Sequence, residues 1–277
     1  MRRAHRIDGM AWVVLAALLC VGAVVVTAIS AEGGAALATA PLATALDWRP
    51  ALGLHEPWRL WTCAWVHGSA AHLLVNAAGA LVVAFVGWRA RLPPSAAFAW
   101  FLAWPLTQVA MAALGSDRVG AAMPHYGGLS GVLHAGAIVL GLSLAWPLAR
   151  ARVRPPAAPL RVDTGFVATR ASAIEPSRIT EGPWAMTEMG AHTALPASTL
   201  DQPPPVVEVE RPLRERWIGV AIVVGTVVKV VLEVPWDLAP RPSAALGISV
   251  APVAHACGVV AGLLAWGMAR LLITRSR

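Results

Sequence analysis

Hydrophobic positions along the 277-residue chain gather into six continuous runs. Each run approaches the roughly 20 residues that an α-helix needs to cross the hydrocarbon core of a bilayer. Backbone groups in lipid must be hydrogen-bonded within the segment, and the sequence lacks the period-2 alternation of a membrane barrel. The pattern therefore predicts an all-α membrane bundle with six spans, at residues 10–30, 71–88, 95–115, 128–149, 214–234 and 250–273.

Two stretches interrupt this pattern. Residues 31–70 are rich in proline and tryptophan, which predicts an interfacial, partly membrane-embedded periplasmic loop; its residues include Pro41, Pro50, Pro57, Trp48, Trp58, Trp61 and Trp65. Residues 150–212 combine prolines with mixed charges and lack periodic apolar positions, as is typical of a disordered cytoplasmic insert. Spans one to four then occupy residues 1–149, and residues 213–277 hold spans five and six with a basic cytoplasmic tail.

Composition excludes a soluble globular domain. Hydrophobic residues make up 57% of the chain and charged residues 13%, with a mean hydropathy of +0.62. The net charge of +7 does not indicate nucleic-acid binding, because the basic residues cluster at the ends of apolar runs. When six spans alternate, these arginines fall on one side, which predicts a multi-pass bacterial inner-membrane protein with both termini cytoplasmic: Arg2, Arg3, Arg6, Arg89, Arg91, Arg150, Arg152, Arg154, Arg270, Arg275 and Arg277.

The cysteines indicate neither a metal site nor a disulfide. Cys20, Cys63 and Cys257 lie far apart in the sequence, so we interpret them as packing residues. The basic amino terminus before an apolar run resembles a signal peptide, but the run has spanning length and predicts an uncleaved signal anchor. No metal or cofactor is expected.

Candidate chemistry begins on the second predicted span. His72 and Asn76 are four residues apart, which places both on one helix face near the periplasmic end. Taken alone, an interhelical polar contact is as good an interpretation as a functional role.

The fourth predicted span begins with a serine between glycines, in Gly127-Gly128-Leu129-Ser130-Gly131. First-turn amides have no intrahelical acceptor and lie at the positive end of the helix dipole, so they suit an oxyanion. For an isolated motif, a helix N-cap with glycines for close packing is the alternative.

In the sixth predicted span, His255, Gly258 and Gly262 share one helical stripe. Small residues let helices approach closely, which would press His255 against a neighbouring helix within reach of a serine hydroxyl. A buried histidine bonded to a carbonyl is the alternative, but ionisable groups in spans are costly and usually functional.

The predicted topology brings these groups to one depth. His72, Ser130 and His255 each lie within about two turns of a periplasmic helix end. A nucleophile, a base and oxyanion donors at one depth indicate a serine hydrolase site that water reaches from the periplasm.

These motifs resemble the rhomboid intramembrane proteases in order, spacing and span, over residues 10–149 and 213–273. Trp58-Arg59 resembles the W-R motif that supports the first loop, and His67 with His72-x-x-x-Asn76 resembles the second-span pattern. Two further matches are the family's G-x-S-G and A-H-x-x-G-x-x-x-G motifs, at Gly128-Leu129-Ser130-Gly131 and Ala254-His255-x-x-Gly258-x-x-x-Gly262.

The resemblance implies a six-transmembrane-helix rhomboid-like bundle with a Ser–His dyad. In it His255 takes the proton of Ser130, and His72 and Asn76 help bind the oxyanion. No carboxylate is required, and none of the nearest candidates has a spacing that argues for a triad: Asp47, Asp117, Glu233 and Asp237.

Within the family the chain is most similar to the rhombosortases, which process secreted proteins that end in a glycine-rich motif, an apolar span and a basic tail. The supporting segments are Asp47-Trp48-Arg49, Gly131-Val132-Leu133-His134 and Lys229-x-x-x-Glu233. The resemblance thus implies membrane-anchored protein substrates with C-terminal Gly-rich anchors, and no nucleic acid. The insert at 150–212 departs from the compact family pattern.

Two further features have alternative interpretations. Lys229 and Glu233, four residues apart, are expected to form a structural ion pair rather than a proton relay. His134, one turn after Ser130, is expected to pack against His255 rather than to act as an alternative base.

Two other functions compete with the protease. A catalytically inactive rhomboid-like protein would bind or escort membrane proteins, but both Ser130 and His255 are present. A six-span transporter would need more intramembrane charges and a half-repeat symmetry, and neither is evident in the sequence.

Overall fold

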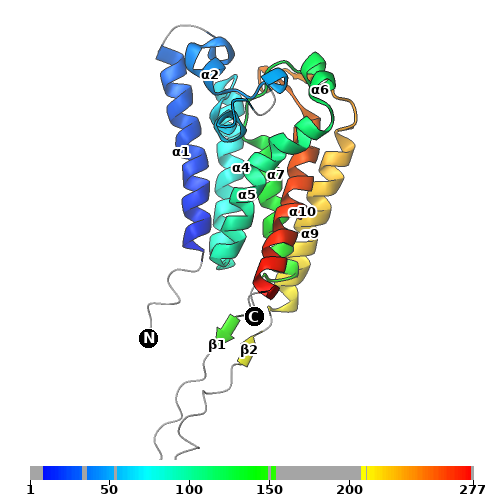
Figure 1. The fold of residues 1–277 in the computed structure, drawn as a ribbon. Helices are drawn as coiled ribbons and strands as arrows, with labels where there is room; N and C mark the ends of the chain where they lie inside the picture. Colours follow the sequence, from blue (N-terminus) through cyan, green and yellow to red (C-terminus); the bar gives the residue numbers. More distant parts are fainter. Residues whose placement is uncertain are drawn as a thin grey trace, which may run out of the picture. The chain divides into compact units, whose positions relative to one another are not determined.

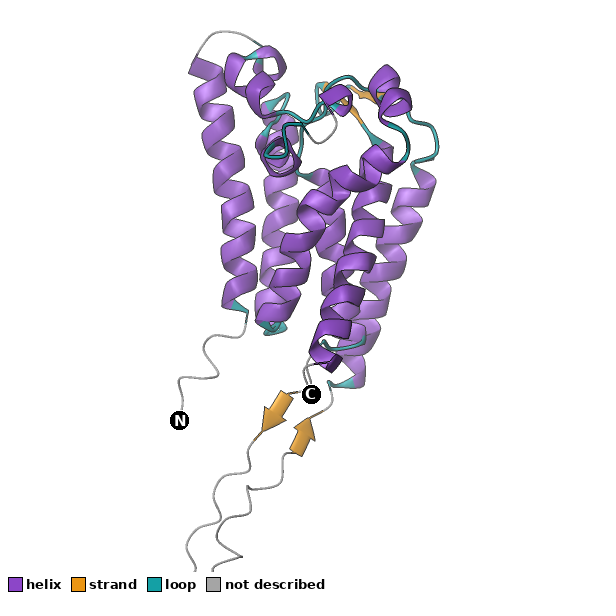
Figure 2. Cartoon of the chain, viewed as in Figure 1, coloured by secondary structure: helices purple, strands orange, loops and turns teal. Residues whose placement is uncertain are grey.

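The computed structural model describes residues 9–32, 36–52, 55–148, 151–153, 207–209 and 211–275. The chain divides into two compact units, residues 1–149 with 211–277 and residues 150–210. The first unit is a helical bundle that holds every candidate site residue (Figures 1 and 2).

Each predicted apolar run forms one long helix of the bundle (Figure 1). The six helices are α1 (Met10–Glu32), α4 (Ala70–Arg89), α5 (Pro94–Ala113), α7 (Ser130–Ala145), α9 (Leu213–Leu232) and α10 (Pro252–Arg275). Four of them, α1, α4, α5 and α10, are long and apolar enough to cross a membrane. The chain is therefore an all-α membrane protein, whereas the six-span count stays a prediction, because α7 is short and α9 carries four charged residues.

Helix α7 is shorter than the predicted run at 128–149. It has 16 residues, which rise about 24 Å at 1.5 Å per residue, less than the roughly 30 Å of a hydrocarbon core. Pro147 limits its carboxyl end, since proline and the residue before it disfavour helix. Its neighbours α4, α5, α9 and α10 pack around it, and most of its side chains are buried.

Glycines bring α7 into direct backbone contact with α10. A Cβ atom at Gly258 would lie 2.0 Å from the carbonyl oxygen of Gly131, and one at Gly262 would lie 2.7 Å from that of Ala135. Farther along α7, a Cβ atom at Gly219 of α9 would lie 2.5 Å from the carbonyl oxygen of Gly141. The spacing between these helices therefore requires residues without side chains.

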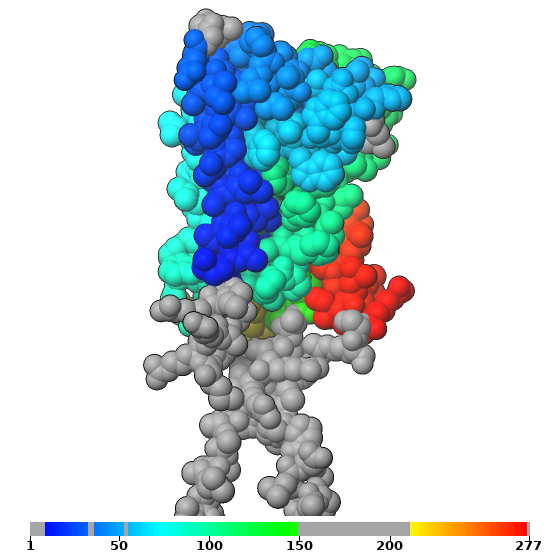
Figure 3. All heavy atoms as spheres, turned by 60° about the vertical axis from the view of Figure 1, so that its left-hand side comes forward, coloured from blue at the N-terminus to red at the C-terminus, as the bar shows by residue number. Residues whose placement is uncertain are grey.

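The outward faces of the bundle are apolar, as expected for contact with lipid. Figure 3 shows α1 lying along one flank of the molecule. Each of α1, α4, α9 and α10 exposes large hydrophobic side chains, and their exposed charged residues, such as Glu32, Arg89 and Arg270, lie near helix ends, with Lys229 of α9 close to the site. On α1 the exposed large hydrophobic residues are Met10, Val14, Leu18, Val21, Val24, Val25 and Ile29.

The predicted loop at 31–70 folds into short helices at one end of the bundle (Figure 1). They are η2 (Leu37–Thr39), α2 (Pro41–Leu46), η3 (Pro50–Leu52), α3 (Arg59–Thr62) and η4 (Cys63–Trp65). Trp48 exchanges two backbone hydrogen bonds of 2.8 Å with Tyr126, and Asp47 bonds His125 at 2.6 Å. The loop is thus tied to the segment that leads into Ser130.

Arg59 fixes the inner end of this loop, whereas Trp58 is half exposed. The buried Arg59 guanidinium donates to the side chain of Asp47 at 2.8 Å and to its carbonyl oxygen at 2.6 Å, and it also pairs with Glu56. A buried carboxylate needs such a partner, so Asp47 and Arg59 stabilise each other.

The bundle also contains elements that the hydrophobic pattern did not predict. Helix α6 (Ser116–Ala122) follows α5, and an antiparallel hairpin of β3 (Arg241–Ser243) and β4 (Ile248–Val250) connects α9 to α10. Strand β4 of this hairpin lines the cavity that contains the candidate site residues.

The second unit contains a two-stranded antiparallel ladder, β1 (Ala151–Val153) with β2 (Val207–Val209), in which Ala151 is opposite Val209. This ladder pairs residues near the two ends of the predicted insert at 150–212, and the disorder of that insert stays a prediction. Residues 154–206, the larger part of that prediction, lie outside the described residues.

Candidate functional site

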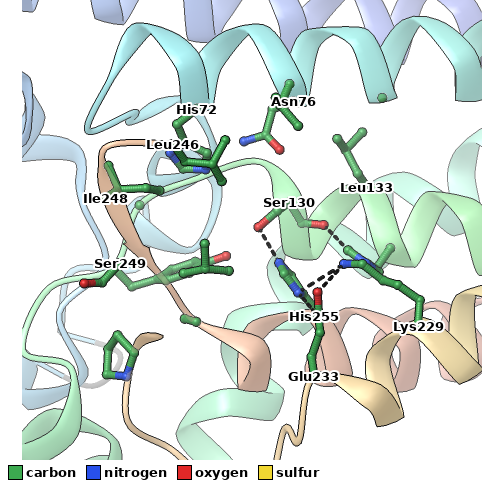
Figure 4. A pocket seen from close by; sticks show the side chains of 18 of the residues that line it. His72, Asn76, Ser130, Leu133, Lys229, Glu233, Leu246, Ile248, Ser249 and His255 are labelled. Atoms are coloured by element: carbon green, nitrogen blue, oxygen red, sulfur yellow. Dashed lines mark hydrogen bonds and ion pairs between the residues drawn. The ribbon is translucent and has the colours of Figure 1, made fainter. Parts of the chain in front are cut away.

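Ser130 and His255 meet at the contact between α7 and α10. The Ser130 Oγ lies 3.0 Å from the His255 Nε2 (Figure 4). Both are in the first turn of their helices, and the Gly131–Gly258 contact sets the distance between those turns. A hydroxyl within hydrogen-bonding distance of a neutral imidazole is the geometry of a nucleophile with its general base.

The backbone before Ser130 is shaped for close approach. Gly128 has a φ of +139°, a conformation that side-chain-bearing residues rarely adopt, and a Cβ atom there would lie 2.8 Å from the His72 Cε1. The N-cap of α7 is Leu129, which provides no side-chain cap among the described residues, so the first-turn amides keep free hydrogen-bonding capacity. An oxyanion at Ser130 would meet these amides.

A carboxylate orients His255, which the sequence did not predict. The His255 Nδ1 lies 2.6 Å from the Glu233 Oε2 (Figure 4). Because Nδ1–H donates to Glu233, the lone pair of Nε2 faces the Ser130 hydroxyl, which is the tautomer that a base requires. A triad pattern is not visible in the sequence because Glu233 is the C-cap of α9 and contacts His255 through tertiary packing. The one sequence feature pointing to it was Lys229-x-x-x-Glu233 before the histidine helix.

The predicted Lys229–Glu233 ion pair is present, and it belongs to a larger network. The Lys229 Nζ lies 2.8 Å from the Glu233 Oε1 and 2.8 Å from the His134 Nε2. The ammonium also lies 3.4 Å from the His255 Nδ1. Lys229 is half exposed, whereas His255 is buried.

His134 stacks on His255 instead of facing the serine hydroxyl. The two rings lie 4.3 Å apart with an interplanar angle of 19°. The His134 Nδ1 donates to the main-chain oxygen of Ser130 at 2.7 Å, and its Nε2 accepts from Lys229. Since both nitrogens are occupied, this arrangement is that of a packing partner and not of a base.

His72 and Asn76 project from α4 into the same cavity (Figure 4). The His72 Nδ1 is buried and has no hydrogen-bond partner among the described residues. The Asn76 Nδ2 donates to the His67 Nε2 at 3.0 Å, and the His67 Nδ1 donates to the Trp65 carbonyl oxygen at 3.2 Å. One amide hydrogen of Asn76 and the His72 ring thus keep donor capacity, and their role at an oxyanion stays a prediction.

His67 supports Asn76 as a neutral ring. Burial lowers the pKa of His67 to about 4, so its Nε2 keeps the lone pair that accepts from Asn76 at neutral pH. Beneath Ser130, burial also raises the pKa of the Tyr126 phenol, which therefore stays neutral. On this side of the site the polar groups are thus uncharged, in contrast to the Lys229–Glu233 pair beside His255.

These groups share a cavity of about 770 Å³ among α4, α7, α9 and the β3–β4 hairpin. Its wall is largely apolar and includes Val75, Val82, Leu133, Leu246 and Ile248. In the part of the chain that the structure describes, no cluster of histidine, cysteine or carboxylate side chains suits a metal ion.

Two of the other carboxylate candidates pair with other basic side chains. Asp47 pairs with Arg59, Arg49 and His125, and Asp237 lies 3.5 Å from Arg241. Of the carboxylates among the described residues, Glu233 is the one that bonds the catalytic candidate.

No protein-family model, curated protein or solved structure matches the chain. Functional assignment therefore rests on the sequence motifs and on the geometry of Ser130, His255 and their neighbours.

Proposed function

We propose that this chain is an intramembrane serine endopeptidase of the rhomboid type. The observation that carries the proposal is the 3.0 Å contact between the Ser130 Oγ and the His255 Nε2, in a cavity walled by apolar helices. Placing an ionisable group such as an imidazole among apolar membrane helices is energetically costly, and such groups are usually functional. A serine hydroxyl bonded to an imidazole of fixed tautomer is the arrangement of a nucleophile and its base.

The reaction begins when the Ser130 Oγ attacks the carbonyl carbon of a peptide bond and His255 Nε2 accepts the hydroxyl proton. The imidazolium then gives this proton to the leaving nitrogen as the C–N bond breaks, which leaves an ester on Ser130. Water attacks the ester while His255 again accepts a proton, and the imidazolium returns this proton to the Ser130 Oγ as the ester C–O bond breaks and the carboxylic acid product leaves. His72, Asn76 and the first-turn amides of α7 stabilise each oxyanion.

The substrates in this proposal are membrane-anchored proteins. Six spans with cytoplasmic termini would place the cavity near the periplasmic face of a bacterial inner membrane, where the cut would release an anchored protein. The rhombosortase-like segments favour substrates with C-terminal Gly-rich anchors. The intact Ser130–His255 pair favours an enzyme over a catalytically inactive binding or escort protein.

A fluorophosphonate probe tests the nucleophile without a known substrate. The purified protein in detergent should be labelled at Ser130, and Ser130→Ala should lose labelling while still folding. Ser116→Ala, at the start of α6, is the matched serine control and should keep wild-type labelling. Equal labelling of Ser130→Ala and the wild type would overturn the proposal.

A further inference from the structure

Behind the proposed base lies a charged pair that a Ser–His dyad does not require. Glu233 bonds the His255 Nδ1 at 2.6 Å, and Lys229 bonds Glu233 at 2.8 Å. We propose that Glu233 and Lys229 are positioning residues that orient His255 and balance the charge it develops, so that the site works as a Ser–His–Glu triad with a lysine counterion. This inference rests on the proposed protease function.

The contacts form a closed ring that begins and ends at Ser130. From the Ser130 Oγ the ring passes to His255, Glu233, Lys229 and His134 and returns to the main-chain oxygen of Ser130. In the one set of tautomers that satisfies all five contacts, His255 and His134 each carry hydrogen on Nδ1. The ring therefore fixes both the orientation of His255 and the nitrogen that faces the serine.

The end of α9 directs Glu233 toward His255. Glu233 is the C-cap of the helix, and Val234 after it has a φ of 57°, which is unfavourable for a β-branched residue. Such local strain persists where the surrounding structure requires it and is common at functional sites. Lys229, in the last turn of α9, also suits the negative end of the helix dipole.

Glu233 and Lys229 have opposite effects on the protonated form of His255. The carboxylate stabilises the imidazolium that forms during attack, and the ammonium limits that stabilisation so that the resting base stays neutral. The other titratable groups around His255 are His134 on α7, His72 on α4, Tyr126 before α7 and Cys257 on α10; α5 (94–113) contributes none. The remaining neighbours are thus uncharged, and the Lys229–Glu233 pair dominates the local charge.

The experiment measures the rate of fluorophosphonate labelling of Ser130 against pH for the full chain in detergent. Glu233→Gln should lower the maximal rate about 100-fold, and its acid limb should move to lower pH, because the unbalanced Lys229 ammonium opposes the imidazolium. Lys229→Met should move the acid limb to higher pH, because the unbalanced carboxylate favours the imidazolium. If Glu233 and Lys229 only supported folding, the acid limbs of the two variants would not move in opposite directions.

A matched control lies at the other end of the same helix. Arg211 and Glu215 form an i,i+4 ion pair of 2.7 Å away from the cavity, so Glu215→Gln should leave both rate and pH profile unchanged. The double variant Glu233→Gln/Lys229→Met removes both charges, so no unpaired charge is left, and it keeps the test usable if a single variant fails to fold. Its labelling rate should stay as low as that of Glu233→Gln, and the acid limb of its pH profile should lie close to the wild-type position.

The outcomes separate this inference from the proposed function. If wild-type Ser130 is not labelled, the protease proposal fails and this inference fails with it. If wild-type Ser130 is labelled but folded Glu233→Gln, or the double variant, matches the wild-type rate and profile, the positioning role alone is overturned. Recovery of most of the rate by Glu233→Asp, relative to Glu233→Gln, would support the carboxylate.

Discussion

Replacing Gly258 with alanine tests whether backbone contact between α7 and α10 sets the distance between Ser130 and His255. A Cβ atom at position 258 would lie 2.0 Å from the Gly131 carbonyl oxygen, whereas real Cβ contacts stay beyond 3.0 Å. The contacted atom is a backbone oxygen, which cannot rotate out of the way as a side chain could. The two helices must therefore separate by about 1 Å. Ser130 and His255 lie in the helical turns that would part.

The expected cost follows from the present distance of 3.0 Å between the Ser130 Oγ and the His255 Nε2. A separation of about 1 Å takes this pair outside the roughly 2.6–3.2 Å range of a general base, and such a displacement costs about 100-fold in rate. Overpacking should also destabilise the bundle by about 1–3 kcal/mol. We therefore expect Gly258→Ala to label about 100-fold more slowly and to unfold at a lower temperature.

The assay compares labelling rate and thermal unfolding in detergent with Gly267→Ala, a substitution on the same helix. A Cβ atom at Gly267 would meet nothing within 4 Å, and alanine raises helix propensity, so this control should keep the wild-type rate and equal or higher stability. A wild-type labelling rate for Gly258→Ala would show that helix contact does not set the Ser130–His255 distance.

Two further predictions concern histidines. His134→Phe keeps a ring stacked on His255 and should label within about tenfold of the wild type, whereas His255→Ala should lose essentially all labelling; equal loss in both would make His134 part of the catalytic machinery. Below pH 6.5 and down to about 4, unfolded His67 binds a proton that the folded protein excludes, so stability should fall as pH falls, by up to about 1.4 kcal/mol per unit. His67→Gln should flatten this slope in thermal unfolding, and an unchanged slope would contradict it.

The sequence by itself determined the helices and most of the candidate chemistry. Spanning length and hydropathy are local properties, so the six apolar runs predicted where the long helices lie. The spacing of His72 and Asn76 predicted that they share a helix face, and both line the cavity. The glycines beside Ser130 and His255 predicted close helix contact, which the structure contains between α7 and α10.

Tertiary structure decided how these residues meet. Ser130 and His255 are 125 positions apart, and Glu233 reaches His255 across the turn after α9, so no periodicity within one helix encodes these contacts. The same holds for the Asn76 bond to His67 and for the Lys229 bond to His134. Hydrophobic patterning specifies which face of a helix is buried, but hydrogen-bond partners depend on distances of a few tenths of an ångström, which only the packing of whole helices fixes.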